Sequence, residues 1–227
     1  LFDIFVILWV GDILSIYAVA ALFLFPFRRL GSKALLAIAS LYLLFTVIPG
    51  AIEYHARVAL VERVEAAKVH EAAHQPFAKE DREVLRAWNA KLQKLTPNDE
   101  QRKRIAAERK AHTGDVAGYY SWAAATWATQ IWGEGLFPIW VWEAFSTMLI
   151  GVALWKWGVT QGDRSGRFYL AMMVAAYAVG IGVRWISTSE LMMFSPAPKI
   201  GWMTSEIGRL GVGLGHLALF NRLWKSG

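Results

Sequence analysis

The chain of 227 residues contains no cysteine, which excludes disulfide bonds and metal sites built from thiolates. It has no internal repeat and no low-complexity segment, and no charged stretch or small-residue cleavage site marks a secretory signal peptide. An initial methionine is also absent, and Leu1 already lies inside an apolar run. We therefore expect the chain to be an internal fragment of a longer protein.

Apolar residues dominate what is present. Hydrophobic residues make up 56% of the chain, 12 residues are tryptophan, and the mean hydropathy is +0.32, values outside the usual range of soluble globular proteins. The net charge of +6 would point to nucleic acid in a soluble chain. In so apolar a chain it indicates basic loops beside anionic headgroups, so we expect a lipid bilayer and no nucleic acid as partner.

Several segments are long and apolar enough to cross about 30 Å of hydrocarbon, which takes roughly 20 helical residues. Only helices satisfy their own backbone polar groups in lipid without closing into a barrel. The sequence therefore predicts an all-α polytopic membrane protein with about five transmembrane helices. They are expected at 1–27, 34–54, 136–155, 168–188 and 203–223.

The distribution of basic residues predicts the orientation. Lysine and arginine gather in the short loops at 28–33 and 156–167 and again after residue 221, whereas the short loop at 189–202 has only Lys199. Short basic loops stay in the cytoplasm during insertion. The chain is thus predicted to divide into first membrane helices (1–54), an extracytoplasmic helical insertion with an interfacial helix (55–135), and three further membrane helices (136–227).

The predicted insertion holds more than half of the 24 lysines and arginines and most of the histidines. Segments 56–74 and 79–95 have the pattern of amphipathic helices, and a third helix runs to His112 with Thr96 or Asn98 as its cap. Gly114-Asp115 ends that helix. The tyrosines and tryptophans from Tyr119 to Trp132 then predict a helix lying in the outer membrane interface.

Residues 70–74 match the HExxH pattern of zinc hydrolases. In that pattern two histidines one helical turn apart bind zinc while the glutamate activates water. His70, Glu71 and His74 are therefore weak metal candidates, because Lys68 adds a charge, Pro76 follows at once, and no third ligand is evident. A solvated helix face is the preferred interpretation, and no metal is expected.

His216 is the only histidine inside a predicted span. A lone intramembrane histidine can ligate haem or a pigment metal, but haem in helical bundles commonly takes a second axial ligand, and no other span supplies one. We prefer a hydrogen bond to a neighbouring helix, with Gly211 and Gly215 forming a close helix-contact face.

Four of the ionisable residues within the predicted spans are candidate site residues. Asp12 is deep in the first apolar run, where a carboxylate must face other helices or a wet cavity. Glu143, Arg184 and Arg209 each lie roughly one to two turns from the outer ends of their helices. Burying three charges is costly unless they pair with each other or with a ligand, so an ion-paired clamp and a substrate site both explain them.

The residues around Asp12 resemble a known family. Trp9-Val10-Gly11-Asp12-Ile13-Leu14, Tyr17-Ala18-Val19 and Phe27-Arg28-Arg29-Leu30 are similar to the W-x-GDIL-x-x-YAL…RR run of the YeiB-like family, bacterial inner-membrane proteins defined by a domain of unknown function. The later stretch from Leu149 to Leu154, followed by Gly158-Val159, resembles the L-x-G-x-A-L-x-x-x-G-V span of the same family.

This resemblance implies a function at the bacterial inner membrane. The family is distantly grouped with membrane acyltransferases, which implies transfer of an acyl group from an acyl thioester donor to an extracytoplasmic envelope acceptor. Asp12, Tyr17, Glu143, Arg184 and Arg209 would then be candidate substrate-binding residues, with the catalytic residues unassigned. Two alternatives stay open: a small-molecule or lipid transporter, and a non-catalytic subunit that joins a larger membrane complex through the glycine-rich last helix and the insertion.

Overall fold

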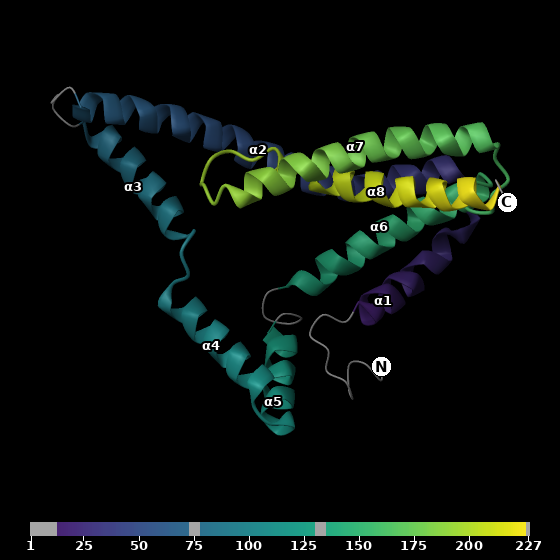
Figure 1. Ribbon diagram of the computed structural model, residues 1–227, viewed down its shortest axis with the longest axis horizontal. Helices are drawn as coiled ribbons and strands as arrows, with labels where there is room; N and C mark the ends of the chain where they lie inside the picture. The colour runs from purple at the N-terminus through teal and green to yellow at the C-terminus, as the bar shows by residue number, and fades with distance from the viewer. Residues whose placement is uncertain (1–12, 73–77, 130–134, 226–227) are drawn as a thin grey trace. The chain divides into compact units, whose positions relative to one another are not determined.

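The computed structural model describes residues 13–72, 78–129 and 135–225. Within these ranges the regular structure is helical and contains no strand, which confirms the all-α prediction for the described part of the chain (Figure 1). The helices divide into two compact units, Leu1–Tyr42 with Asn98–Asp163 and Leu43–Pro97 with Arg164–Gly227.

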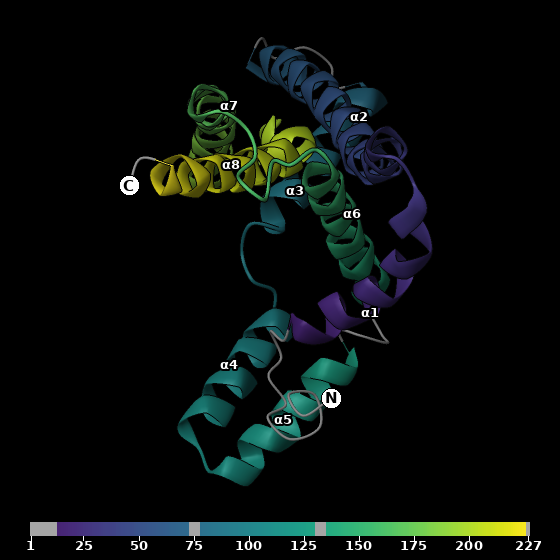
Figure 2. The same ribbon diagram turned by 90° about the vertical axis from the view of Figure 1, so that its right-hand side faces the viewer.

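The first unit contains a pair of apolar helices and a hairpin made of one charged helix and one aromatic-rich helix. Its helices are α1 (Leu14–Leu24), the short 3-10 helix η2 (Phe25–Arg29), the start of α2 (Ser32–Ala72), α4 (Asp99–Thr113), α5 (Val116–Ala128) and α6 (Leu136–Lys156). Figure 2 shows α1 alongside α6, and these two helices contact each other along their lengths. Because Ala20, Val141 and Ala144 are small or β-branched and buried between them, the two helices approach closely.

A second apolar cluster joins the start of α2 to the end of α6. Leu35 and Ala39 are buried against Leu149 and Ala153, all at most 2% exposed. At the end of α6, the Lys156 ammonium donates to the carbonyl oxygen of Arg28 at 2.9 Å. This bond satisfies a carbonyl near the end of η2, where no helical partner follows.

The second unit is built around a glycine-lined helix pair. It contains the rest of α2 (Ser32–Ala72), α3 (Lys79–Gln93), α7 (Gly166–Met192) and α8 (Gly201–Trp224). α7 and α8 contact each other more extensively than any other two helices among the described residues. Gly180 and Gly211 meet at their interface, and Gly215 lies against the ring of Tyr177, so the predicted Gly211–Gly215 face packs on α7.

α2 is one helix where the sequence predicts two. The span at 34–54 and the amphipathic segment at 56–74 join without a break in the 41 residues of Ser32–Ala72. The physical reason is that no glycine or proline follows Gly50 before residue 72. Pro49 lies inside the helix but does not end it.

Three described helices, α2, α6 and α7, are long and apolar enough to cross a membrane. Only 6% of the apolar window of α7 is buried within the chain, so its surface suits lipid better than water. The predicted span at 1–27 lies partly outside the described residues. The predicted span at 203–223 lies in α8, whose 24 residues are long enough to cross a membrane but not apolar enough to be counted with these three helices. The three long apolar helices therefore support a membrane protein, whereas the number of five spans remains a prediction.

The hairpin of α4 and α5 has the helix start and stop signals that the sequence predicts. Asn98, one of the two predicted caps, closes a capping box with Gln101, and Gly114 ends α4. Asp115 then caps α5 by accepting a hydrogen bond from the Gly118 backbone N–H at 2.6 Å. The His112 ring packs edge-on against the rings of Tyr119 and Trp122, with centroids 5.3 and 4.9 Å apart, and so joins the two helices.

Candidate functional site

An apolar groove lies between α1 and α6 in the first unit. Its volume is about 470 Å³, within the roughly 300–1,000 Å³ typical of small-molecule pockets. None of the described side chains that line it is ionisable. They are Val19, Phe23, Phe27, Phe137, Pro138, Val141, Trp142 and Phe145.

Helical periodicity places these side chains on facing walls. Phe137, Val141 and Phe145 follow one another at intervals of four residues, so they share one face of α6. Phe27 crosses from the other wall, and its ring meets that of Phe145 edge-on with the centroids 5.3 Å apart. This ring contact joins the two walls of the groove.

The chemistry of the groove is that of a hydrocarbon site. Apart from the indole N–H of Trp142 its walls are aromatic and aliphatic, so they hold a hydrocarbon chain by dispersion contacts. A polar headgroup would find no charged partner among the eight lining residues. The groove therefore suits an acyl chain better than the head of a lipid or a sugar.

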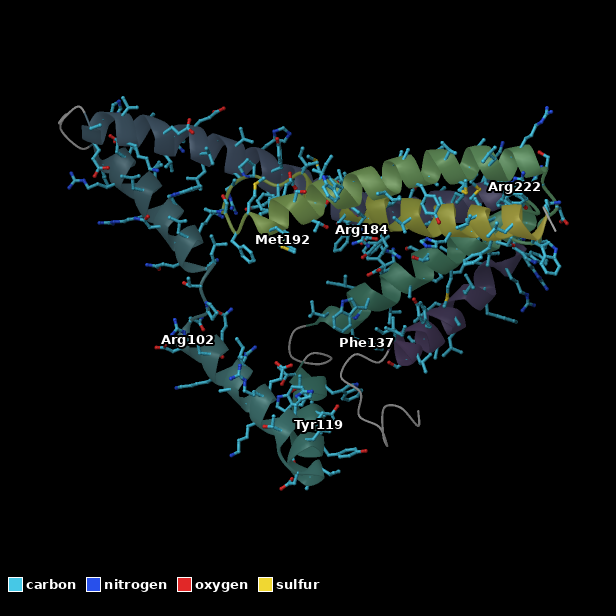
Figure 3. All side chains as sticks on the ribbon, viewed as in Figure 1. Arg102, Tyr119, Phe137, Arg184, Met192 and Arg222 are labelled. Atoms are coloured by element: carbon cyan, nitrogen blue, oxygen red, sulfur yellow. The ribbon has the colours of Figure 1, made fainter. Side chains whose placement is uncertain are left out.

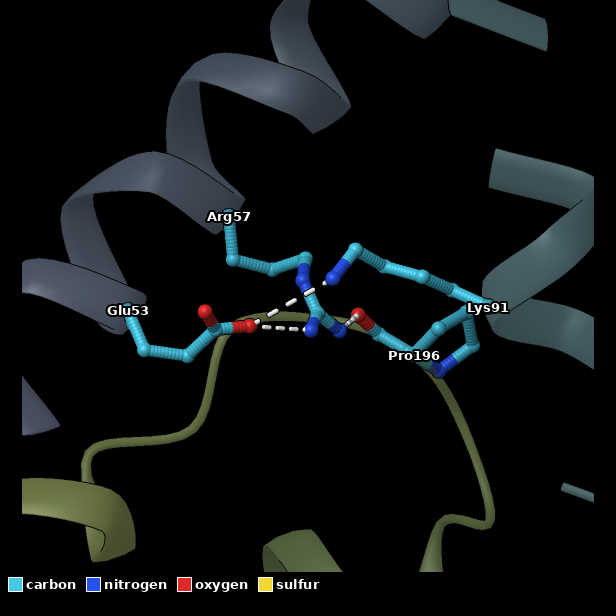
Figure 4. Close-up of polar contacts among 4 residues, drawn as sticks. All are labelled: Glu53, Arg57, Lys91 and Pro196. Carbon is cyan, nitrogen blue, oxygen red and sulfur yellow. Dashed lines mark hydrogen bonds and ion pairs between the residues drawn. The ribbon is translucent and has the colours of Figure 1, made fainter. Parts of the chain in front are cut away.

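A polar cluster lies in the second unit and is built from α2, α3 and the segment between α7 and α8 (Figure 4). The Arg57 guanidinium donates from Nη2 to Oε1 of Glu53 and from Nη1 to the carbonyl oxygen of Pro196, the latter at 2.6 Å. Nζ of Lys91 lies 3.5 Å from the same Glu53 oxygen. One carboxylate thus binds two cations from two helices.

Arg57 is only 9% exposed, which makes this cluster unusual among the charged residues of the described chain. Its guanidinium also lies 5.0 Å from the centre of the Trp202 ring, a cation–π contact. Because Glu53 and Pro196 already occupy its Nη atoms, we interpret the cluster as a structural connection of α2 to α3 and to the 193–200 segment.

The predicted charged constellation is divided between the two units. Glu143 belongs to the first unit, whereas Arg184 and Arg209 belong to the second, on α7 and α8. Arg209 binds Glu206 of its own helix, with Nε and Nη2 at 2.9 and 2.8 Å from Oε2. The contact of Glu143 with either arginine remains a prediction.

Arg184 is exposed on α7, where Figure 3 labels it, and the stem of its side chain lies against α8 at Gly208. Asp12 lies outside the described residues. Tyr17 is on α1, 44% exposed, and is not among the residues that line the groove. The structure therefore does not bring Tyr17 to the apolar groove.

His70 and Glu71, the first two residues of the HExxH pattern, lie at the end of α2. Nδ1 of His70 is 3.2 Å from Oδ2 of Asp81 on α3, so this histidine contacts a carboxylate of the neighbouring helix. Glu71 lies in the last turn of α2, and His74 falls outside the described residues. The described part of the chain contains no group of three or more potential metal-ligating side chains.

His216 bonds within its own helix. Its Nδ1 lies 2.8 Å from the carbonyl oxygen of Val212, and its ring meets that of Tyr177 on α7 edge-on at 5.4 Å. The preferred hydrogen bond to a neighbouring helix is thus replaced by a bond to the preceding turn and a ring contact across the α7–α8 interface.

Two glutamates with specific contacts were not predicted from the sequence. The carboxylate of Glu190 accepts hydrogen bonds from the backbone N–H groups of Ile200 and Gly201, both at 2.9 Å, and so caps the start of α8 with a negative charge. Glu206 pairs with Arg209, and their separation of three residues on one helix is a readable signal. No comparable signal marks Glu190, because its partners lie beyond a loop.

Comparisons with known proteins give no match, whether with family models, with curated proteins or with solved structures. The resemblance of the GDIL segment to the YeiB-like family therefore stays a prediction. The function has to be argued from the groove and from the apolar helices.

Proposed function

We propose that the chain is a multi-pass protein of the bacterial inner membrane that holds an acyl chain in the α1–α6 groove for transfer to an extracytoplasmic acceptor. Three observations support the proposal: the apolar groove, the three helices able to cross a bilayer, and the resemblance to the YeiB-like family. The groove is the observation that carries it. One of its walls belongs to α6, which is long and apolar enough to cross a bilayer, so a lipid chain can enter from the hydrocarbon without crossing water.

In the proposed reaction an acceptor hydroxyl oxygen bonds to the acyl carbon of a thioester. The carbon–sulfur bond breaks, and the hydroxyl proton passes through a general base to the departing thiolate. None of the eight lining residues can act as that base. The proposal therefore assigns binding and orientation of the chain to the groove and leaves the proton transfer to residues outside its lining.

The test is photo-crosslinking with an acyl thioester that carries a diazirine at the end of its chain. The protein is reconstituted in lipid nanodiscs, and crosslinked residues are identified by mass spectrometry. We expect labelling at Phe23, Phe137 and Phe145 that unlabelled thioester competes away. Trp155 and Phe220, exposed apolar residues outside the groove, are the internal control and should show only labelling that resists competition.

Labelling spread evenly over exposed apolar residues, without competition at the groove, would contradict the proposal. Competition at the groove without any transfer of the acyl label to a sugar acceptor would favour a lipid transporter, the alternative supported by the lack of an ionisable lining residue. Stable co-purification with a larger membrane complex, without bound lipid, would instead favour a non-catalytic subunit.

A further inference from the structure

One face of α4 combines cationic and apolar side chains. A shallow groove of about 490 Å³ runs along it, lined by Arg102, Ile105, Ala106, Arg109, Lys110 and Thr113. These positions repeat at three and four residues, which places them on one side of the helix. No carboxylate is among the described residues of this lining.

This face borders the contact with α5, because His112, whose ring packs on Tyr119 and Trp122, follows Ile105 by seven residues and so lies near one edge of the groove. Ala111 is the only buried residue of α4 and lies about half a helical turn from the middle of the groove. Ile105 is 50% exposed although it is apolar, and Figure 3 shows Arg102 on the same helix. α4 therefore presents an apolar strip bordered by positive charge to its surroundings.

The chain also limits how far the hairpin can move from α6. α5 ends at Ala128 and α6 begins at Leu136, so eight Cα steps join them. At about 3.5 Å per step the connection reaches at most about 28 Å. If α6 lies in a bilayer, the hairpin is held at the surface of that bilayer at high effective concentration.

We propose that this face of α4 binds the anionic phospholipid headgroups of the bilayer that holds α6. Lysine and arginine side chains are attracted to an anionic surface, and the exposed side chain of Ile105 contacts the acyl boundary below the headgroups. α4 lies along the membrane surface, and α5 lies beside it, where His112 packs on Tyr119 and Trp122. The inference rests on the proposed membrane placement of α6.

The absence of cysteine from the chain makes a site-specific test direct. Ala106→Cys and Ala107→Cys form a matched pair, because both residues are exposed neighbours on α4 but only Ala106 lines the groove. Each variant of the full chain is labelled with an environment-sensitive fluorophore in nanodiscs of phosphatidylcholine, with or without phosphatidylglycerol. Quenching by a lipid-soluble agent and by an aqueous agent is then compared.

We expect phosphatidylglycerol to shift the Ala106 probe from aqueous to lipid quenching and to leave the Ala107 probe in water. Arg109→Glu should abolish the shift, whereas Arg104→Glu, the same charge change on the opposite side of the helix, should retain it. An Ala106 probe that stays in water, or responds equally to neutral lipid, overturns the inference. Its protection by a co-purifying protein also overturns it, in favour of a protein partner.

Failure of the protein to float with lipid vesicles would instead reject the proposed function, because α6 would then not reside in a bilayer. A chain that floats with lipid but keeps the Ala106 probe in water would reject only the role of α4.

Discussion

Gly180 of α7 and Gly211 of α8 lie so close that neither position has room for a side chain. A Cβ added to Gly180 would lie 2.6 Å from the carbonyl carbon of Gly211, and one added to Gly211 would lie 2.7 Å from Cα of Gly180. Cβ atoms do not approach backbone atoms so closely, so the two helices would have to separate. The α7–α8 pair therefore depends on the absence of these two side chains.

Gly180→Ala and Gly211→Ala should each destabilise the protein by about 1–3 kcal/mol, the usual result of overpacking a tight interface. Gly182→Ala and Gly213→Ala are matched controls on the same helices, since an added Cβ there meets nothing within 4 Å. The controls should be neutral or slightly stabilising, because alanine favours a helix over glycine. Thermal unfolding in mild detergent measures the stability of the two interface variants and the two controls. Equal effects at all four positions would contradict the close contact.

Glu53→Ala should destabilise the second unit by about 1–2 kcal/mol, because it leaves the nearly buried Arg57 guanidinium without its carboxylate, although the Glu53 side chain is itself 45% exposed. Glu65→Ala, an exposed glutamate of the same helix, is the control and should have little effect. Lys91→Ala should cost at most about 1 kcal/mol, since its contact is long and its side chain is 35% exposed. A neutral Glu53→Ala would mean that the cluster does not hold α2, α3 and the 193–200 segment together.

The predicted contact of Glu143 with an arginine can be measured by a double-mutant cycle. Residues in contact usually show coupling energies of about 0.5–3 kcal/mol. We expect Glu143→Gln to destabilise the protein and Arg209→Gln or Arg184→Gln to restore part of the loss. Glu206→Gln with Arg209→Gln is the positive control, because that pair is 2.8 Å apart. Coupling in the control but with neither arginine for Glu143 would exclude the predicted cluster.

The predicted orientation can be read from single cysteines, because the chain has none of its own. Cysteines at Ser32 and Ser165 should resist an impermeant thiol reagent in intact cells, since short basic loops remain in the cytoplasm. A cysteine at Ala87, an exposed residue of α3, should react. The reverse pattern of labelling would place the insertion in the cytoplasm.

The purified protein is expected to lack stoichiometric zinc. His70 contacts Asp81, and the described residues hold no group of three potential ligands, so a zinc ion has no evident coordination sphere there. Elemental analysis should give the same zinc content for the parent chain, His70→Ala and His74→Ala. One zinc per chain that disappears in either variant would restore the metal site as a hypothesis.

Local signals predicted most of the helices but few of their partners. The span predicted at 168–188 is the core of α7, and Asn98 and Gly114 bound α4 as their side-chain chemistry indicates. Near residue 55 the sequence changes from apolar to polar without a helix-breaking residue. The change marks where the surroundings of α2 become polar, and the helix itself continues. Polarity and secondary structure are independent there.

Contacts between distant segments could not be read from spacing. The bond of Arg57 to Pro196 joins residues 139 positions apart, and only the fold brings them together. The apolar groove likewise depends on how α1 meets α6, although its residues looked like ordinary membrane-span residues in the sequence. By contrast, the i,i+3 pair of Glu206 and Arg209 was readable from helix geometry alone.

The unbroken α2 has a consequence for dimensions. Its 41 residues span about 62 Å at 1.5 Å per residue, roughly twice the thickness of the hydrocarbon layer. If its apolar half crosses that layer, the half of the helix beyond Glu53 projects out of the layer. His70 lies 17 residues beyond Glu53, or about 25 Å further along the axis. The length of this projecting segment would then set the distance between the hydrocarbon layer and the contact of His70 with Asp81.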